Sequence, residues 1–162
     1  SEDHCPEITP KMTYPNTNWF LVEFSVDAAP ERMNRILQRY ADAGFLPVIA
    51  HPERYSAVQE DPSLATQWFK KGYIIQLNKG SILGRLGRKA ENTAHWILSR
   101  GLAHVVASDA HGVRMRTPWM QEVRQLLSEE FSPKYARKLL WENPGKILKD
   151  EEILPAEPEW FE

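Results

Sequence analysis

Side chains that can bind a metal ion end or follow three short apolar runs of this chain. Glu23 lies near the end of the first run, His51 directly follows the second, and Asp109 and His111 follow the third. In α/β barrels the apolar run is a buried strand with polar residues at its carboxyl end, so these four side chains are expected to share one mouth. A set of carboxylates and imidazoles suits Zn, Mn or Fe better than Ca.

Each of these residues also has a plainer interpretation. A histidine beside apolar residues can be a hydrogen-bonded core residue, and the Asp of a Ser-Asp-Ala-His stretch can form an ordinary turn. The metal interpretation is favoured because Pro52 stops the strand directly after His51 and because the neighbours of Glu23 are apolar. A buried carboxylate without a cation would be energetically costly.

The pattern of apolar residues predicts strands and helices that alternate along the chain. Strands are expected at about residues 19–24, 46–50, 73–77 and 103–107. Helices are expected at about residues 29–44, 63–71, 90–100, 118–130 and 133–141, and loops at 51–55 and 78–88. This alternation implies an α/β fold in which parallel strands are joined by right-handed crossovers. Four strands are too few to close a barrel, so either further strands are missing from this chain or the sheet stays open.

The composition argues against several classes of protein. The 20 basic and 22 acidic residues give a net charge of -2 without a basic block, so no nucleic-acid partner is expected. Cys5 is the single cysteine and cannot form an internal disulfide, which suits a reducing cytoplasm. No apolar run approaches ~18 residues, so no membrane span is expected. No Cys-x5-Arg loop is present, which excludes the chemistry of covalent cysteine phosphatases.

The length of 162 residues suits a single domain. We expect this domain at residues 1–148, followed by an acidic, proline-bearing tail at residues 149–162. The chain begins with Ser1 rather than Met, so a trimmed chain or a fragment is expected, with a domain that is incomplete at its N-terminal side.

Six motifs follow one another between residues 19 and 148. They are Leu21-Val-Glu-Phe24, Pro47-Val-Ile-Ala-His-Pro-Glu-Arg-Tyr55, Gly80-Ser-Ile-Leu-Gly-Arg-Leu-Gly-Arg88, Ala107-Ser-Asp-Ala-His111, Arg116-Thr-Pro118 and Asn143-Pro-Gly-Lys-Ile-Leu148. In this order they resemble the bacterial PHP-type (polymerase and histidinol phosphatase) protein-tyrosine phosphatases, manganese-dependent enzymes of capsule and exopolysaccharide operons. The resemblance covers only about the C-terminal two-thirds of that family's domain, because its N-terminal Asp-x-His-x-His strand and the next Asp and His ligands have no match here.

The resemblance implies a fold and a set of site residues. The fold would be a partial, distorted (β/α)7 barrel that lacks its N-terminal strands. The residues that match metal-ligand positions are Glu23, His51, Asp109 and His111, with Glu2 as a remnant of a further ligand strand. Arg54 and Arg116 match arginines that hold the substrate phosphate, which fits the ability of a guanidinium to bind two phosphate oxygens at once.

The expected function is therefore metal-dependent hydrolysis of a phosphomonoester. The resemblance implies manganese, with Fe, Zn or Mg as alternatives, and a phosphotyrosine protein as substrate, namely a bacterial tyrosine autokinase of polysaccharide synthesis. His111 is a candidate acid that would protonate the leaving phenolate. A phenol has a pKa of ~10, so the phenolate leaves readily and needs little acid catalysis. A homo-oligomer is compatible with this interpretation. Two alternatives stay open: a PHP hydrolase of small phosphate esters, and an inactive or truncated PHP domain that acts as a binding module.

Overall fold

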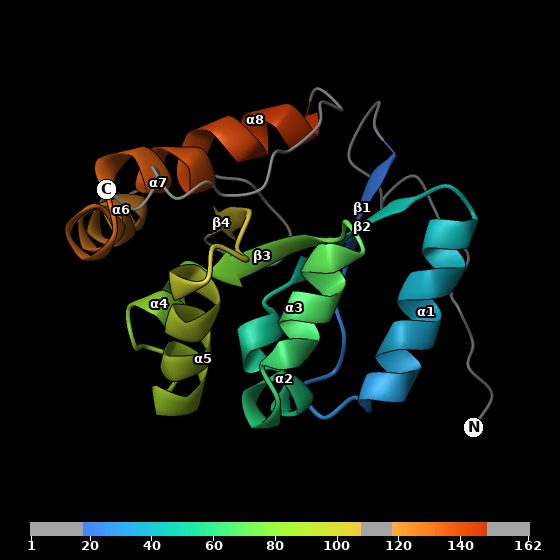
Figure 1. The fold of residues 1–162 in the computed structure, drawn as a ribbon. Coiled ribbons are helices and arrows are strands. Elements are labelled where there is room, and N and C mark those ends of the chain that lie inside the picture. Colours follow the sequence, from blue (N-terminus) through green and yellow to red (C-terminus); the bar gives the residue numbers. More distant parts are fainter. Residues whose placement is uncertain (1–17, 108–117, 149–162) are drawn as a thin grey trace.

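The computed structural model describes residues 18–107 and 118–148 of the chain. Four strands, β1 (Trp19–Val22), β2 (Leu46–Ala50), β3 (Ile74–Asn78) and β4 (Val105–Ala107), form one sheet in the order β1-β2-β3-β4 (Figure 1). Each strand is parallel to its neighbour. The predicted parallel α/β sheet in chain order is confirmed, and the bounds of its strands differ from the expected ones by two residues at most.

Helices connect and follow these strands. They are α1 (Pro30–Asp42), α2 (Ser56–Glu60), α3 (Ser63–Lys70), α4 (Lys79–Ile82), α5 (Arg88–Ser99), α6 (Pro118–Glu130), α7 (Pro133–Arg137) and α8 (Asn143–Leu148), with a 3₁₀ turn η1 (Pro52–Arg54) and a π turn η2 (Lys138–Glu142). Two stretches that were expected to be plain loops, residues 51–55 and 78–88, therefore contain η1 and α4. The last predicted helix also continues beyond Trp141, because the π turn leads directly into α8. None of the helices in the described ranges is long and apolar enough to cross a membrane.

The helices that precede β2, β3 and β4 each end two residues before a glycine, namely Gly44, Gly72 and Gly101. At the end of α1, Gly44 has a φ of 90°, its N–H donates to Ala41 O at 3.0 Å, and the next N–H donates to Tyr40 O at 3.0 Å. This pair of hydrogen bonds satisfies the last carbonyl groups of the helix and turns the chain into the following strand. A residue with a Cβ atom adopts this backbone conformation only at a cost.

Both faces of the sheet are buried, which explains why its strands consist almost entirely of apolar residues. One face contributes Phe20, Ile49, Ile75 and Val106 to a large core that includes residues of α1, α3, α5, α6 and α7. On the other face, a smaller cluster consists of Trp19, Val48, Ile74 and Val105 together with Ile147 of α8. In Figure 1, α8 lies on the side of the sheet opposite α1 and α3.

Strand β4 begins later than expected because a side chain takes the place of a backbone partner. The Nδ1 atom of His104 accepts the N–H of Ile75 at 2.9 Å, and the N–H of His104 donates to Ile75 O at 2.9 Å. Burial lowers the pKa of His104 to about 4, so the ring is neutral and can accept. The ring also stacks on Phe69 with a centroid separation of 5.1 Å. His104 is therefore a residue of the core.

Candidate active site

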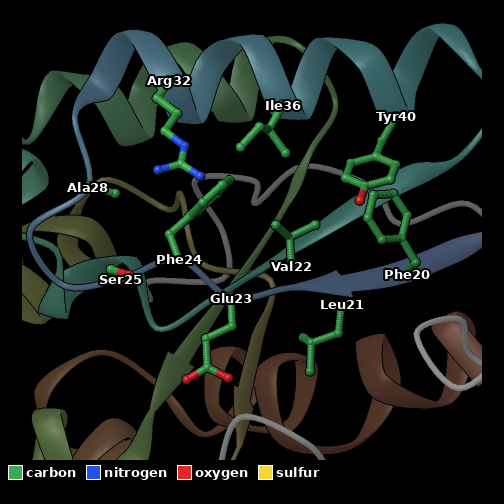
Figure 2. A pocket seen from close by; sticks show the side chains of 10 residues that line it. All are labelled: Phe20, Leu21, Val22, Glu23, Phe24, Ser25, Ala28, Arg32, Ile36 and Tyr40. Atoms are coloured by element: carbon green, nitrogen blue, oxygen red, sulfur yellow. The ribbon is translucent and has the colours of Figure 1, made fainter. Parts of the chain in front are cut away.

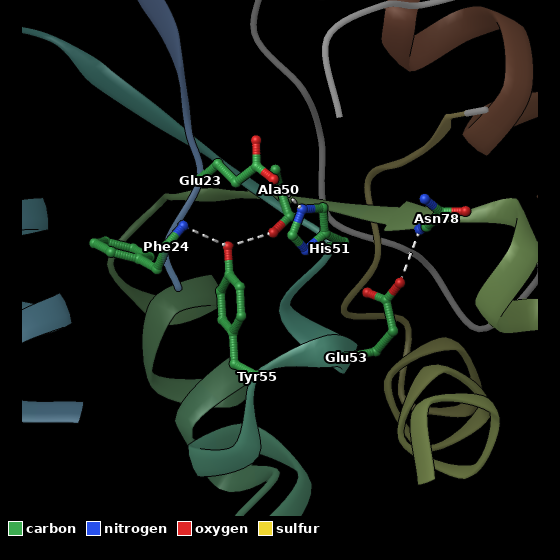
Figure 3. A network of polar contacts seen from close by, with 7 residues as sticks. All are labelled: Glu23, Phe24, Ala50, His51, Glu53, Tyr55 and Asn78. Atoms are coloured by element: carbon green, nitrogen blue, oxygen red, sulfur yellow. Dashed lines mark hydrogen bonds and ion pairs between the residues drawn. The ribbon is translucent and has the colours of Figure 1, made fainter. Parts of the chain in front are cut away.

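Glu23 and His51 meet at the carboxyl ends of two neighbouring strands. The register pairs Val22 with Ile49, so Glu23 directly follows β1 and His51 directly follows β2. The Nε2 atom of His51 lies 3.0 Å from Glu23 Oε1 (Figure 3). The imidazole is almost fully buried, whereas 42% of the Glu23 side chain is exposed. The two side chains therefore form a pair that solvent reaches from the Glu23 side.

The backbone of His51 adopts an unusual conformation. Its φ of 37° is the one positive value among the non-glycine residues of the described part of the chain. Its N–H donates to Gln76 O on β3 at 2.7 Å, and its C=O accepts the N–H of Arg54 at 3.0 Å. A left-handed residue with a Cβ atom costs roughly 1–2 kcal/mol, so the surrounding structure holds His51 in place against local preference. Such strain concentrates at functional sites.

The pair has the chemistry and spacing of two ligands to one metal ion. Ligand atoms that are each ~2.1 Å from an ion, at angles of roughly 90–109°, lie about 3.0–3.4 Å apart, which matches the separation of Nε2 and Oε1. The Nδ1 atom of His51 is buried and has no hydrogen-bond partner among the described residues, which do not fully satisfy the ring as they would that of a core histidine. A mixed carboxylate and imidazole set fits a transition-metal ion.

Within residues 18–107 and 118–148, no group of three or more His, Cys, Asp or Glu side chains gathers closely enough to hold a metal ion. The other expected ligands, Glu2, Asp109 and His111, lie outside the described residues, as does Arg116. The last described residue of β4 is Ala107, two positions before Asp109. Because the strands are parallel, β4 ends at the same edge of the sheet as β1 and β2.

Arg54 lies in the η1 turn, three residues after His51, and is half-buried. Among the residues that the structure describes, none forms a hydrogen bond or ion pair with its guanidinium group. Arg85, in contrast, forms an ion pair with Glu122 of α6 at 2.6 Å, and both side chains are exposed. Arg54 thus lies close in sequence to His51 and forms no ion pair with a described residue.

Glu53 connects the turn after His51 to the neighbouring strand β3. It is fully buried in η1, and its Oε1 atom accepts the backbone N–H of Asn78, at the end of β3, at 2.9 Å (Figure 3). Burial raises its pKa to about 7, and the Asn78 N–H opposes this rise most strongly. The Ser81 hydroxyl also lowers the pKa, although no hydrogen bond of standard geometry reaches Glu53 Oε2. Glu53 thus supports the turn after His51.

Tyr55 is a residue that the sequence did not single out. Its side chain is fully buried, and its hydroxyl donates to Ala50 O at 2.6 Å and accepts the N–H of Phe24 at 3.1 Å. Burial raises the pKa of this hydroxyl, so it remains protonated. No sequence pattern indicates this contact, because it depends on where three separate segments meet.

A cavity of about 220 Å³ lies between β1 and α1. Its lining includes Phe24, Arg32 and Ile36 (Figure 2). In Figure 2 the carboxylate of Glu23 points to the opposite side of β1 from these three side chains. Glu23 also lines this cavity, but its carboxylate points away from it.

Comparisons with known proteins identify the family to which this chain belongs. The family described as "Capsular polysaccharide synthesis, CpsB/CapC" matches residues 6–149. The chain belongs to the CpsB/CapC family. Its fold also matches a chain from the crystal structures of YwqE from Bacillus subtilis and CpsB from Streptococcus pneumoniae, which are described as unique metal-dependent tyrosine phosphatases. That match has a TM-score of 0.77 at 32% sequence identity and covers 90% of this chain and 58% of the other.

Two curated relatives illustrate the extent of the similarity. The tyrosine-protein phosphatase YwqE of Bacillus subtilis is 33% identical over 144 residues, which are 89% of this chain and 56% of YwqE. The tyrosine-protein phosphatase CpsB of Streptococcus pneumoniae is 31% identical over 146 residues, which are 87% of this chain and 60% of CpsB. The chain thus spans a little more than half the length of these members of the CpsB/CapC family.

Proposed function

We propose that this chain carries part of the catalytic site of a metal-dependent protein-tyrosine phosphatase. The observation that supports this most directly is the pairing of Glu23 and His51 at adjacent strand ends, with the Nε2–Oε1 separation of two ligands to one ion. Arg54, whose guanidinium group forms no ion pair with a described residue, lies three positions from His51. The similarity to YwqE and CpsB, both called tyrosine-protein phosphatases, supports the same activity.

In this proposal the residues of the chain have separate tasks. Glu23 and His51 hold a divalent ion, which when bound supplies Lewis-acid activation of water and of the phosphate. Arg54 binds equatorial oxygens of the phosphoryl group and stabilises the charge that develops there. Asp109, His111 and Glu2 are proposed as further ligands on the strength of the sequence resemblance. Arg116 is proposed as a second phosphate-binding residue, and His111 as the acid for the leaving phenolate, on the same basis.

The finer aspects of the function rest on the same resemblance. We propose manganese as the ion, with Fe, Zn or Mg as alternatives. The proposed substrate is a phosphotyrosine protein, specifically a bacterial tyrosine autokinase of polysaccharide synthesis, which places the reaction in the cytoplasm. The family name, which refers to capsular polysaccharide synthesis, supports this assignment.

A phosphatase assay tests the proposal. With the family's N-terminal ligand strands supplied upstream, we expect the chain to hydrolyse a phosphotyrosine peptide in the presence of Mn²⁺ and to stop after addition of a chelator. Arg54→Ala should lower the rate by a factor of about 100–1,000, because it removes a charged contact to the transferred group. Arg85→Ala is a matched control, since Arg85 is paired with Glu122, and its rate should stay within about twofold of the wild type.

Two results would contradict the proposal. Faster hydrolysis of a small alkyl phosphate than of the phosphotyrosine peptide would favour the alternative of a PHP hydrolase for small esters. Mn²⁺ binding without any turnover would favour a binding module. A binding module is the second candidate because the family's N-terminal Asp-x-His-x-His strand has no match in this chain.

A further inference from the structure

The hydrogen-bonded ladder between β1 and β2 ends just where the candidate ligands begin. The last paired residues are Val22 and Ile49, and the next positions are Glu23 and Ala50. Beyond this point a side chain continues the connection between the two strands. The hydroxyl of Tyr55 accepts the N–H of Phe24 at 3.1 Å and donates to Ala50 O at 2.6 Å. Figure 3 shows both contacts converging on the tyrosine oxygen.

The two backbone groups that Tyr55 joins belong to residues adjacent to the ligands. Phe24 directly follows Glu23, and Ala50 directly precedes His51. We propose that Tyr55 is a positioning residue that sets the separation between Glu23 and His51. This inference rests on the proposed function in so far as it assigns the two residues to a metal site.

The ring of Tyr55 reinforces the connection that its hydroxyl makes. It packs edge-on against the ring of Phe24 at a centroid separation of 5.9 Å and against the ring of His51 at 5.5 Å. A phenylalanine would preserve both contacts and the buried volume. It would, however, leave the Phe24 N–H without its acceptor and the Ala50 carbonyl without the donor that the hydroxyl provides. An unpaired polar group in a buried place is costly. The hydroxyl is therefore the specific part of this residue.

A second side chain of the same turn, Glu53, is hydrogen-bonded to strand β3. Tyr55 reaches β1 and β2, whereas Glu53 accepts the Asn78 N–H at the end of β3. His51 therefore begins a short turn whose two buried polar side chains connect three strand ends. Groups that support metal ligands in this manner typically change metal affinity or activity by a factor of about 10–100 when they are removed.

The test compares Tyr55→Phe with Tyr135→Phe in the full chain. Tyr135 is an appropriate control because it is also fully buried and its hydroxyl donates to a backbone carbonyl, Leu98 O at 3.0 Å, away from Glu23 and His51. Two properties are measured: the ¹⁵N chemical shifts of the His51 ring without metal, and the dissociation constant for Mn²⁺ by titration calorimetry. Urea unfolding gives the stability of each variant.

We expect Tyr55→Phe to shift the His51 ring signals toward a mixture of tautomers, because the imidazole loses its fixed hydrogen bond to Glu23. We also expect it to weaken Mn²⁺ binding by a factor of about 10–100. Tyr135→Phe should leave the ring signals unchanged and the dissociation constant within about twofold of the wild type, at a comparable loss of stability.

Unchanged His51 ring signals in Tyr55→Phe would overturn the inference, as would equal effects of the two substitutions. The proposed function fails by a different result. If His51→Gly bound Mn²⁺ as tightly as the wild type, His51 would not be a ligand. The ring signals of His51 in metal-free Tyr55→Phe would still decide whether Tyr55 positions the His51 ring.

Discussion

At the scale of single residues, the site combines a strained backbone with side chains that are held from several directions. His51 is left-handed, with hydrogen bonds from its backbone to β3 and to Arg54 and from its ring to Glu23. These contacts compensate for a conformation that a residue with a Cβ atom otherwise avoids. The effect of the backbone conformation of His51 on stability can be measured separately from the effect of its ring.

Replacing His51 by Gly should leave a more stable protein than replacing it by Ala. Both variants lose the imidazole, but only alanine retains the penalty of a Cβ atom at a φ of 37°. After allowance for the greater flexibility of unfolded glycine, we expect a difference of about 1 kcal/mol in the free energy of unfolding. Urea denaturation of the two variants measures it. An alanine variant as stable as the glycine variant would show that the turn relaxes when the ring is absent.

His104 should make the stability of the protein depend on pH. Its pKa is about 4 in the folded protein, because it is buried, and 6.5 in the unfolded chain. Above pH 6.5 the His104 ring is neutral in both the folded and the unfolded state, so the protein has its full stability with respect to this residue. As the pH falls from 6.5 toward 4, the unfolded chain binds a proton that the folded protein rejects, and stability decreases by up to roughly 3 kcal/mol.

Urea unfolding between pH 8 and pH 4 measures this loss, with His104→Asn as the control. Asparagine can still accept the Ile75 N–H through its side-chain oxygen but does not titrate. The variant should lose less stability over the same pH interval than the wild type. Identical pH profiles would mean that other groups account for the decrease.

At the scale of elements, single polar contacts decide how helices dock on the sheet. Asn143, at the first position of α8, is buried and donates from Nδ2 to His104 O at 2.8 Å, just before β4 begins. Four residues later, Ile147 joins the cluster on the second face of the sheet. The contact thus determines where α8 lies and covers that face.

Asn143→Ala should destabilise the protein by about 1–3 kcal/mol, because it leaves the His104 carbonyl without its side-chain donor in a buried place. Thermal or urea unfolding provides the measurement. Asn92→Ala is a suitable control, because Asn92 is exposed on α5, and it should change stability by less than about 0.5 kcal/mol. A similar small change for both variants would show that α8 docks through its apolar residues alone.

At the scale of the whole molecule, the candidate site lies at the carboxyl edge of the sheet, whereas both faces of the sheet are packed against apolar residues. An ion bound between Glu23 and His51 would stabilise the folded state only, because those residues are far apart in the unfolded chain. At a Mn²⁺ concentration 100 times the dissociation constant, we expect a gain of about 2.7 kcal/mol in the free energy of unfolding.

A melting curve with Mn²⁺, and a second curve after addition of EDTA, would detect this gain and its reversal. His51→Gly should show no metal-induced shift. A shift of the same size in His51→Gly would place the ion elsewhere in the molecule.

The local features of this protein could be predicted from its sequence, because each depends on neighbouring residues. Apolar runs of strand length, prolines at helix starts and glycines at helix ends encode the alternation of strands and helices without reference to distant contacts. The same local order places Glu23 after β1 and His51 after β2. Parallel strands then bring these residues to one edge, which is why the pairing was foreseeable.

The contacts that support the site could be identified only in the tertiary structure. The bonds from Tyr55 to Phe24 and Ala50, and from Glu53 to Asn78, join residues up to 31 positions apart through groups that every peptide possesses. The same holds for the His104 ring that replaces a strand partner of Ile75. A backbone N–H or C=O carries no sequence signature, so which side chain satisfies it depends on the packing of the folded chain.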